Sequence, residues 1–242
     1  MLKLTSVSIL SITFGGLLQA ATINTKDAGV ISAFQSGATV VNFENISGRT
    51  AQTITSYTSG NPVSSSAFVF DQIPGVQFSV GGMVGTNEPA LYSLSGAIAG
   101  DAHSPTTVLG PVDFDFTTKF NAGSMIEIFF PTKVSEVGFW LNPALGNVEL
   151  IAADTNFAFS HLTETTLETA ASVTAGNFVG IQRPTADIGG FKIIGLGTSG
   201  FTVDDFTFGG ASSTAVPEPG SLVLLACGMA ALVSLRYRRR TR

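Results

Sequence analysis

From residue 22 to residue 210 the chain repeats one pattern, in which a short run of alternating apolar and polar residues ends in Gly, Pro, Asn or Ser. Residues 75–80 and 112–116 show the alternation most clearly. A period of two places successive side chains on opposite faces of a strand, and the turn-forming residues end each strand after a few positions. The pattern therefore predicts an all-β body, a β-sandwich or jelly roll. The predicted strands are residues 39–43, 75–80, 112–116, 125–130, 134–141, 147–153, 177–182, 191–196 and 201–208.

Two segments of the body depart from this pattern. Pro131, Thr132 and Lys133 separate two of the predicted strands and predict a turn between them. Residues 164–171 are the one stretch that favours a helix, although its threonines are poor helix formers.

Composition indicates a chain with a large apolar core. Hydrophobic residues make up 44% of the chain and charged residues 12%, against roughly 25% charged residues in ordinary globular chains. The aromatic residues are mostly Phe, with 19 Phe against 3 Tyr and 1 Trp. Phe has no polar atom, so its expected place is between two sheets. Trp140 lies between Phe139 and Leu141, and we expect it to pack in the core as well; the alternative is that it serves as an aromatic platform on which a sugar stacks.

The body is strongly acidic. Between residues 22 and 217 the chain has six Lys or Arg residues against sixteen Asp or Glu residues, a net charge near −10. Such a surface repels the phosphate backbone of nucleic acids, so no nucleic-acid partner is expected. It suits cations or a hydrated polysaccharide matrix.

Little in the sequence indicates catalysis. The only histidines, His103 and His161, lie in loop-like surroundings, and no sequence motif of a nucleophile elbow, metalloprotease or nucleotide-binding loop is present. The single cysteine, Cys227, lies in an apolar run and allows no intramolecular disulfide. Asp113 and Asp115 could imitate a glycosidase pair, but two carboxylates at this spacing are more often a solvated strand edge. We therefore expect a protein that is not an enzyme.

Residues 1–21 have the organisation of a secretory signal peptide. Lys3 gives a positive start, Leu4 to Leu18 are mostly apolar, and Ala20 and Ala21 offer small residues for cleavage. The alternative, a buried N-terminal helix, is disfavoured by Gly15 and Gly16.

The C-terminal region has three parts. Residues 211–220 form a linker that contains Pro217, Glu218 and Pro219, and residues 221–235 carry no charge. A helix over residues 221–235 would span about 22 Å at 1.5 Å per residue, which is short for a hydrocarbon core of about 30 Å. Residues 236–242 are a basic tail that is expected to stay in the cytoplasm while the body faces outward. The positive charges of this stop are Arg236, Arg238, Arg239 and Arg240.

These three parts, in this order, resemble the C-terminal signal of PEP-CTERM proteins. The resemblance implies processing near Pro217, Glu218 and Pro219 by an exosortase, a membrane-embedded protease-like enzyme. It further implies a membrane-anchored intermediate, then release or transfer to the cell surface, commonly in bacteria that make exopolysaccharide and biofilm. The alternative is an ordinary tail-anchored protein with a proline hinge, which the short apolar segment disfavours.

The body also resembles carbohydrate-binding-module-like jelly rolls, including galactose-binding ones. The matching residues are 41–44, which contain Glu44, and 203–206, which contain Asp204 and Asp205. In such jelly rolls a Glu of the first strand and an Asp of the last hold a structural calcium, and carboxylate oxygens are the ligands that calcium prefers. The resemblance therefore implies a calcium site at Glu44, Asp204 and Asp205. The alternative is that the two aspartates simply solvate the end of a strand.

Together these features predict five segments: a signal peptide (1–21), a β-sandwich domain (22–210), a linker with the Pro-Glu-Pro motif (211–220), a transmembrane sorting helix (221–235) and a basic cytoplasmic tail (236–242). Three hypotheses for the body follow. The first is a non-catalytic structural protein of the cell envelope or exopolysaccharide, the second a carbohydrate-binding surface module, and the third a glycoside hydrolase. The sorting tail and the absence of a catalytic motif favour the first.

Overall fold

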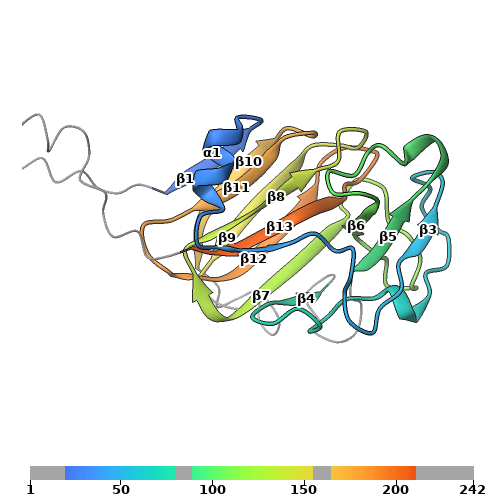
Figure 1. Ribbon diagram of the computed structural model, residues 1–242, viewed down its shortest axis with the longest axis horizontal. Coiled ribbons are helices and arrows are strands. Elements are labelled where there is room, and N and C mark those ends of the chain that lie inside the picture. The colour runs from blue at the N-terminus through green and yellow to red at the C-terminus, as the bar shows by residue number, and fades with distance from the viewer. Residues whose placement is uncertain (1–19, 80–88, 155–164, 211–242) are drawn as a thin grey trace, which may run out of the picture.

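The computed structural model describes residues 20–79, 89–154 and 165–210, which form two β-sheets packed face to face (Figure 1). The predicted all-β sandwich is confirmed. The predicted linker, sorting helix and basic tail lie outside the described residues, as do His161 and residues 1–19 of the predicted signal peptide. The last residue of that predicted segment, Ala21, is the first residue of a strand. Within the described residues, no helix combines the length and apolarity that a membrane crossing requires.

The larger sheet has eight strands, in the order β1-β11-β8-β13-β6-β5-β3, with β2 also paired to β13. Neighbouring strands are antiparallel except β3 and β5, which are parallel. Its strands are β1 (Ala21–Thr25), β2 (Thr39–Val41), β3 (Gln52–Ile54), β5 (Ala90–Leu94), β6 (Thr107–Gly110), β8 (Glu136–Leu141), β11 (Phe178–Gln182) and β13 (Val203–Gly209).

The smaller sheet has five antiparallel strands in the order β10-β9-β12-β7-β4. They are β4 (Gln77–Ser79), β7 (Met125–Val134), β9 (Val148–Ala153), β10 (Thr166–Val173) and β12 (Ile188–Gly195). The described helices are short: α1 (Ala28–Phe34) and the 3₁₀ turns η1 (Ser65–Ala67) and η2 (Gly96–Ile98).

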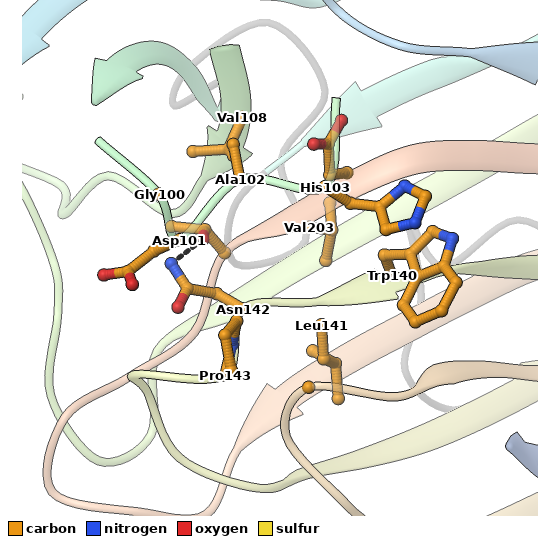
Figure 2. Close-up of a pocket in the computed structure, with 13 residues that line it drawn as sticks. Gly100, Asp101, Ala102, His103, Val108, Trp140, Leu141, Asn142, Pro143 and Val203 are labelled. Atoms are coloured by element: carbon orange, nitrogen blue, oxygen red, sulfur yellow. Dashed lines mark hydrogen bonds between the residues drawn. The ribbon is translucent and has the colours of Figure 1, made fainter. Parts of the chain in front are cut away.

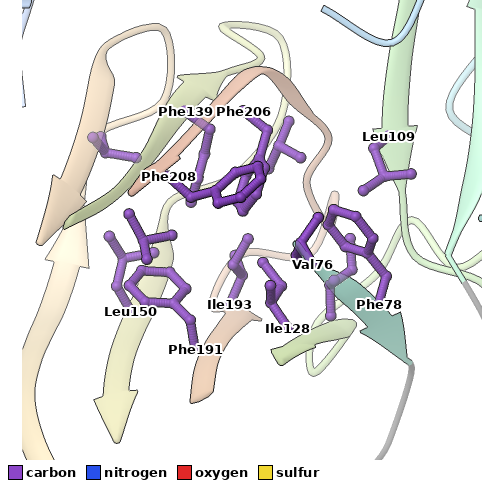
Figure 3. Close-up of a cluster of buried hydrophobic side chains, with 14 of the residues drawn as sticks. Val76, Phe78, Leu109, Ile128, Phe139, Leu150, Phe191, Ile193, Phe206 and Phe208 are labelled. Carbon is purple, nitrogen blue, oxygen red and sulfur yellow. The ribbon is translucent and has the colours of Figure 1, made fainter. Parts of the chain in front are cut away.

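The main core lies between the two sheets and is rich in Phe (Figure 3). In β8 the side chains of Val137, Phe139 and Leu141 point into this core, as their alternation predicts. Phe139 meets Phe191 of the opposite sheet edge to face, with ring centroids 6.4 Å apart. The expectation that Phe fills the space between the sheets is therefore confirmed for most of the buried Phe residues. Phe34, Phe120 and Phe178 pack outside this core, and Phe114 and Phe116 are exposed.

Strand β13 lies inside the larger sheet. One side of it pairs with β8, and the other side pairs with β6 at Val203 and with β2 from Phe206 to Phe208. The strand ends at Gly209, whose carbonyl oxygen accepts hydrogen bonds from the backbone N–H and the hydroxyl of Ser135, each 3.0 Å long. The last described strand is thus held on both sides up to its end.

Helix α1 covers one end of the outer face of the larger sheet. The carboxylate of Asp27 caps it by accepting hydrogen bonds from the backbone N–H groups of residues 29 and 30. Phe34 of the helix packs on the paired glycines Gly138 and Gly180. A Cβ atom at Gly138 would lie 2.9 Å from the rings of Phe34 and Phe178. Glycine is therefore required where the helix approaches the sheet.

A second apolar cluster covers the other end of the same outer face. It is built around Tyr92 of β5, Val108 of β6 and Phe120, and the rings of Tyr92 and Phe120 lie 5.3 Å apart. We call it the outer cluster. Between α1 and the outer cluster, the middle of the sheet's outer face is covered by polar segments.

Three predicted elements are wrong. Residues 131–133 do not turn: β7 continues to Val134, and the register shift between Ile188 and Gly190 of β12 leaves Pro131 without a ladder partner, which suits a residue that lacks an N–H. Residues 113–116 form a turn, because Asp113 accepts from the N–H groups of Phe114 and Phe116.

The third error concerns the predicted helix at residues 164–171. The described part of it belongs to strand β10, which pairs with β9 along an edge of the smaller sheet. Pairing to a neighbouring strand outweighs a weak local preference for helix.

Candidate functional site

A small cavity opens on the outer face of the larger sheet, between α1 and the outer cluster. Its volume is about 130 Å³. Trp140 and Asn142 line it from β8 and the residue after it, Asp204 lines it from β13, and Asp101 and His103 line it from the segment before β6 (Figure 2). We call it the first hollow. It brings an aromatic ring together with carboxylate, amide and imidazole groups.

The imidazole of His103 lies flat on the indole of Trp140. The ring centroids are 4.0 Å apart and the planes differ by 10° (Figure 2). The indole also packs edge-on against the ring of Phe178, with centroids 5.9 Å apart. Trp140 is therefore not a core residue, contrary to expectation. It points outward because it follows the inward-facing Phe139 in β8, and it is only partly buried.

Asp205 holds His103 over the indole, with Nδ1 of His103 2.5 Å from Oδ2 of Asp205. The backbone of Asp205 is left-handed, with φ of +46°, a conformation that Asp tolerates better than most residues. It lies in the irregular stretch of β13 where the pairing register with β8 shifts between Asp204 and Thr207. Because of this irregularity, the adjacent Asp204 and Asp205 both reach the same segment instead of pointing to opposite faces.

Asp204 anchors the next residue of that segment. Its carboxylate accepts hydrogen bonds from the backbone N–H and the hydroxyl of Ser104, both 2.6 Å long. Burial raises the pKa of Asp204, as does the nearby charge of Asp205, and the hydrogen bonds from Ser104 lower it in part. The net shift is upward, so folding makes this carboxyl harder to ionise.

Glu44 anchors the end of the same segment. Its Oε1 accepts from the backbone N–H groups of Thr106 and Thr107 at 2.8 and 2.7 Å, and its Oε2 accepts from the hydroxyl of Thr107 at 3.1 Å. Burial raises the pKa of Glu44, but these hydrogen bonds outweigh burial and hold the pKa below its ordinary value. Residues 103–107, which we call the anchored segment, are thus fixed by three carboxylates.

Tyr57, Asp101 and Asn142 form a hydrogen-bonded network at the polar end of the first hollow. The hydroxyl of Tyr57 donates to Asp101 at 3.1 Å, and the amide of Asn142 donates to Tyr57 at 2.5 Å and to the hydroxyl of Thr202 at 3.1 Å. Burial raises the pKa of Tyr57, and Asp101 adds to the rise, so the phenol stays neutral in the physiological range. The second carboxylate oxygen of Asp101 can accept a hydrogen bond from a ligand, whereas Oδ1 of Asn142 already accepts one from the backbone N–H of Ala144 at 2.8 Å.

A second, larger hollow lies on the other side of the His103–Trp140 stack. Its volume is about 600 Å³, and it is lined by Ser32, Gln35 and Ser36 at α1 together with His103 and Trp140. Among the described residues that line the two hollows, none is Lys or Arg. The acidic groups there are aspartates, and His103 is the basic side chain among these lining residues.

The three residues expected to hold calcium meet at one place, but they bind protein groups. Glu44, Asp204 and Asp205 all contact the anchored segment through the hydrogen bonds described above. Calcium requires six to eight oxygen ligands, whereas most of these carboxylate oxygens already accept from N–H or O–H groups. No cluster of three or more His, Cys, Asp or Glu residues with metal-binding geometry is found within the described part of the chain.

This donor set does not fit a calcium cage, and calcium binding stays a prediction of the resemblance. Melting of the protein in EDTA and then in excess calcium tests it. An unchanged melting temperature counts against calcium, and a rise on adding calcium supports it.

Asp113 and Asp115 do not form a cleft. They lie at the exposed turn after β6, where Asp113 pairs with Lys119 at 3.3 Å and Asp115 accepts from Thr117 at 2.6 Å. The sorting residues lie outside the described residues.

Sequence reasoning missed His103 as a site residue, because its partner Asp205 lies 102 positions away in the chain.

Comparison with known proteins agrees with the sorting signal. Residues 215–240 match the family described as the PEP-CTERM protein-sorting motif. The chain carries this motif and is an exported protein. The resemblance seen at Pro217, Glu218 and Pro219 is confirmed.

Two solved structures similar to the sandwich are carbohydrate-binding modules. One is TmCBM61 in complex with beta-1,4-galactotriose, 14% identical, covering 56% of this chain and 88% of that chain, with a TM-score of 0.32. The other is the family 32 CBM from C. perfringens NanJ in complex with galactose, 14% identical, covering 59% and 97%, with a TM-score of 0.33. Nothing about a ligand of this chain follows at such TM-scores. No curated protein matches the chain in sequence.

Proposed function

We propose that the protein is a non-catalytic component of the bacterial cell surface or exopolysaccharide matrix, delivered through a processed C-terminal signal. The observation that carries this proposal is the sorting motif at residues 215–240. Pro217 and Pro219 fix their own backbone and keep the preceding residues out of helical geometry. The sequence therefore predicts an extended peptide next to a short apolar segment, which would suit an exosortase-type processing enzyme and a transient membrane anchor.

Mass spectrometry of the protein recovered from its own host tests the processing step. We expect the wild-type protein to lack the apolar segment and the basic tail, and Pro217→Ala to retain both. Pro184→Ala, in the body, is the matched control and should be processed like the wild type. Mature wild-type molecules that keep Arg236 to Arg242 would contradict the proposal.

A second function, polysaccharide binding by the body, is favoured by the His103–Trp140 stack between two open hollows. The imidazole of His103, the more exposed ring of the stack, presents a flat and partly apolar surface, Trp140 lines the hollow on each side of it, and Asp101 provides an acceptor for hydroxyl groups. Flat rings with a few polar groups at the rim are what a hydroxyl-rich ligand needs. This function is compatible with the first, because a matrix protein can bind the matrix that contains it.

Retention on polysaccharide gels tests this second function. Native gels that contain a neutral polysaccharide should retard the wild-type protein, and Trp140→Ala should restore its mobility. Phe114→Ala is the matched control, since it removes an exposed aromatic ring far from the hollows in sequence. Equal mobility of the wild type and Trp140→Ala in every gel would contradict polysaccharide binding, and the structural role would be the remaining proposal. Asp113 and Asp115, the pair that the sequence offered for a glycoside hydrolase, lie on an exposed turn with partners of their own.

A further inference from the structure

The two hollows are neighbours on one face of the molecule, and they share two walls. His103 and Trp140 line both. Asp204, which binds Ser104, lines the first hollow. Asp205, which follows Asp204 in the chain, lines the second. The His103–Trp140 stack therefore stands between two halves of one path across the sheet.

The sizes of the hollows indicate that they act together. Sites for small molecules usually enclose about 300–1,000 Å³. The first hollow, at about 130 Å³, is too small to bury such a ligand alone. The second, at about 600 Å³, is large enough but is more open to solvent. A ligand that fills only one of them would leave the shared walls half covered.

The charges on the path restrict the chemistry of a ligand. Asp101, Asp204 and Asp205 lie along it. Among the described residues that line it, His103 is the one group that can carry a positive charge, and it is already paired to Asp205. Lys26 is not part of this lining, although its Nζ lies 3.8 Å from the place that a Cβ of Gly176 would take. The described lining holds no Lys or Arg to pair with a carboxylate, sulfate or phosphate. On the α1 side the exposed hydroxyls of Ser32 and Ser36 offer both donors and acceptors.

From this arrangement we propose that the two hollows form a single groove that binds the interior of a non-anionic polysaccharide chain, with sugar units on both sides of the His103–Trp140 stack. The inference rests on the polysaccharide-binding function proposed above. It adds that binding depends on chain length and that uronate-containing or phosphate-containing chains are rejected.

A length series tests the groove. The full-length protein is titrated with glucose and galactose and with their neutral β-1,4-linked oligosaccharides up to the hexasaccharide, and with an oligouronate of matched length. Trp140 is the only tryptophan in the chain, so its fluorescence reports binding at the stack directly. We expect the best neutral hexasaccharide to bind at least about tenfold more tightly than its monosaccharide. The oligouronate should not bind.

Two variants of α1 separate the halves of the groove. Ser32→Tyr places a bulky side chain in the second hollow, whereas Ala33→Tyr, at the next exposed position, does not line it. Ser32→Tyr should reduce hexasaccharide affinity by about tenfold and leave monosaccharide affinity unchanged. Ala33→Tyr should behave as the wild type, which controls for an effect of Tyr on the helix itself.

The outcomes distinguish the two proposals. Equal affinity for one sugar unit and for the hexasaccharide, or no difference between Ser32→Tyr and Ala33→Tyr, overturns the groove and leaves a single-sugar site standing. Tighter binding of the oligouronate overturns the predicted ligand class. Absence of binding by every neutral saccharide overturns polysaccharide binding by the body, and the groove with it.

Discussion

The two faces of the eight-stranded sheet are built differently. The inner face is covered by the smaller sheet, and apolar side chains such as Phe139, Val203 and Phe206 meet a matching apolar surface there. The outer face is covered by α1 at one end, by the outer cluster at the other, and by the anchored segment between them. At its centre, carboxylates take the place of apolar contacts: Glu44 and Asp204 hold backbone N–H groups.

The difference shows which interactions can carry a ligand site. Close packing between two sheets leaves little free volume and tolerates few changes. A segment held by hydrogen bonds to a few carboxylates keeps its backbone in place while it leaves open space beside it. The two hollows lie next to the anchored segment for this reason.

The largest effect is expected on the inner face. Phe191 is fully buried and contacts Phe139 across the sandwich. Phe191→Ala removes most of a buried ring and leaves a cavity, which should lower the free energy of unfolding by about 3–5 kcal/mol. Urea denaturation measures this change. Phe191→Leu should lower the free energy of unfolding clearly less than Phe191→Ala does. An equal decrease in both variants would argue against cavity formation as the cause.

A smaller, pH-dependent effect is expected at the anchored segment. Glu44→Gln replaces a carboxylate that accepts three hydrogen bonds, and should lower the free energy of unfolding by about 1–2 kcal/mol near neutral pH. The folded pKa of Glu44 lies below its unfolded value. Its contribution is therefore present above the unfolded pKa and is lost as the pH falls through the folded pKa.

Melting curves of wild type and Glu44→Gln over an acid-to-neutral pH series check this prediction. The gap between the two melting temperatures should be widest near neutral pH and should close in acid. A gap that widens on acidification would mean that Glu44 is not a stabilising anion in the folded protein.

A still smaller effect on stability is expected at the His103–Trp140 stack. His103 is about half exposed, so His103→Ala should lower the free energy of unfolding by less than about 1 kcal/mol. The fluorescence of Trp140 should nevertheless shift to longer wavelength, because water replaces the imidazole on the indole. His103→Phe keeps a flat ring and should emit like the wild type. An unshifted spectrum for His103→Ala would show that the ring does not cover Trp140 in solution.

The smallest effect is expected at the turn after β6. Phe114 is 57% exposed, and Phe114→Ser should change the free energy of unfolding by no more than about 0.5 kcal/mol. Urea denaturation of Phe114→Ser and Phe191→Ala under the same conditions compares the two changes in the free energy of unfolding directly. A loss of several kcal/mol would reveal a packing role for this ring.

The sequence predicted strands most successfully where an apolar face of the strand packs against the core between the two sheets. Strands β9, β11, β12 and β13 were predicted because each is a run of five residues or more that is rich in apolar residues and bounded by turn-forming residues. Strands of three residues, such as β3, contain too little alternation to detect. Helix α1 was missed although Asp27 before residues 28–34 is a helix-capping signal, because seven residues show less than two periods of a helix.

The site could be predicted only in part. Comparison with jelly rolls selected Glu44, Asp204 and Asp205, and these residues do meet at one segment. Their partners in residues 103–107 lie far away in the chain, and three of the six hydrogen bonds come from backbone N–H groups, which any sequence provides. Trp140 was assigned to the core because its neighbours are apolar. Its neighbour Phe139 fills the core, and alternation alone puts Trp140 on the other face.

The position of β13 also has a mechanical consequence. Any tether that acts through the C-terminal region pulls on Gly209, and the force then runs along a strand that is bonded to β8 on one side and to β2 on the other. Such a load is shared by many backbone hydrogen bonds at once, whereas an edge strand would peel away one bond at a time. If the protein is tethered at this end while its outer face binds a polymer, a pulling force loads these hydrogen bonds in shear. The protein would therefore resist unfolding under that force.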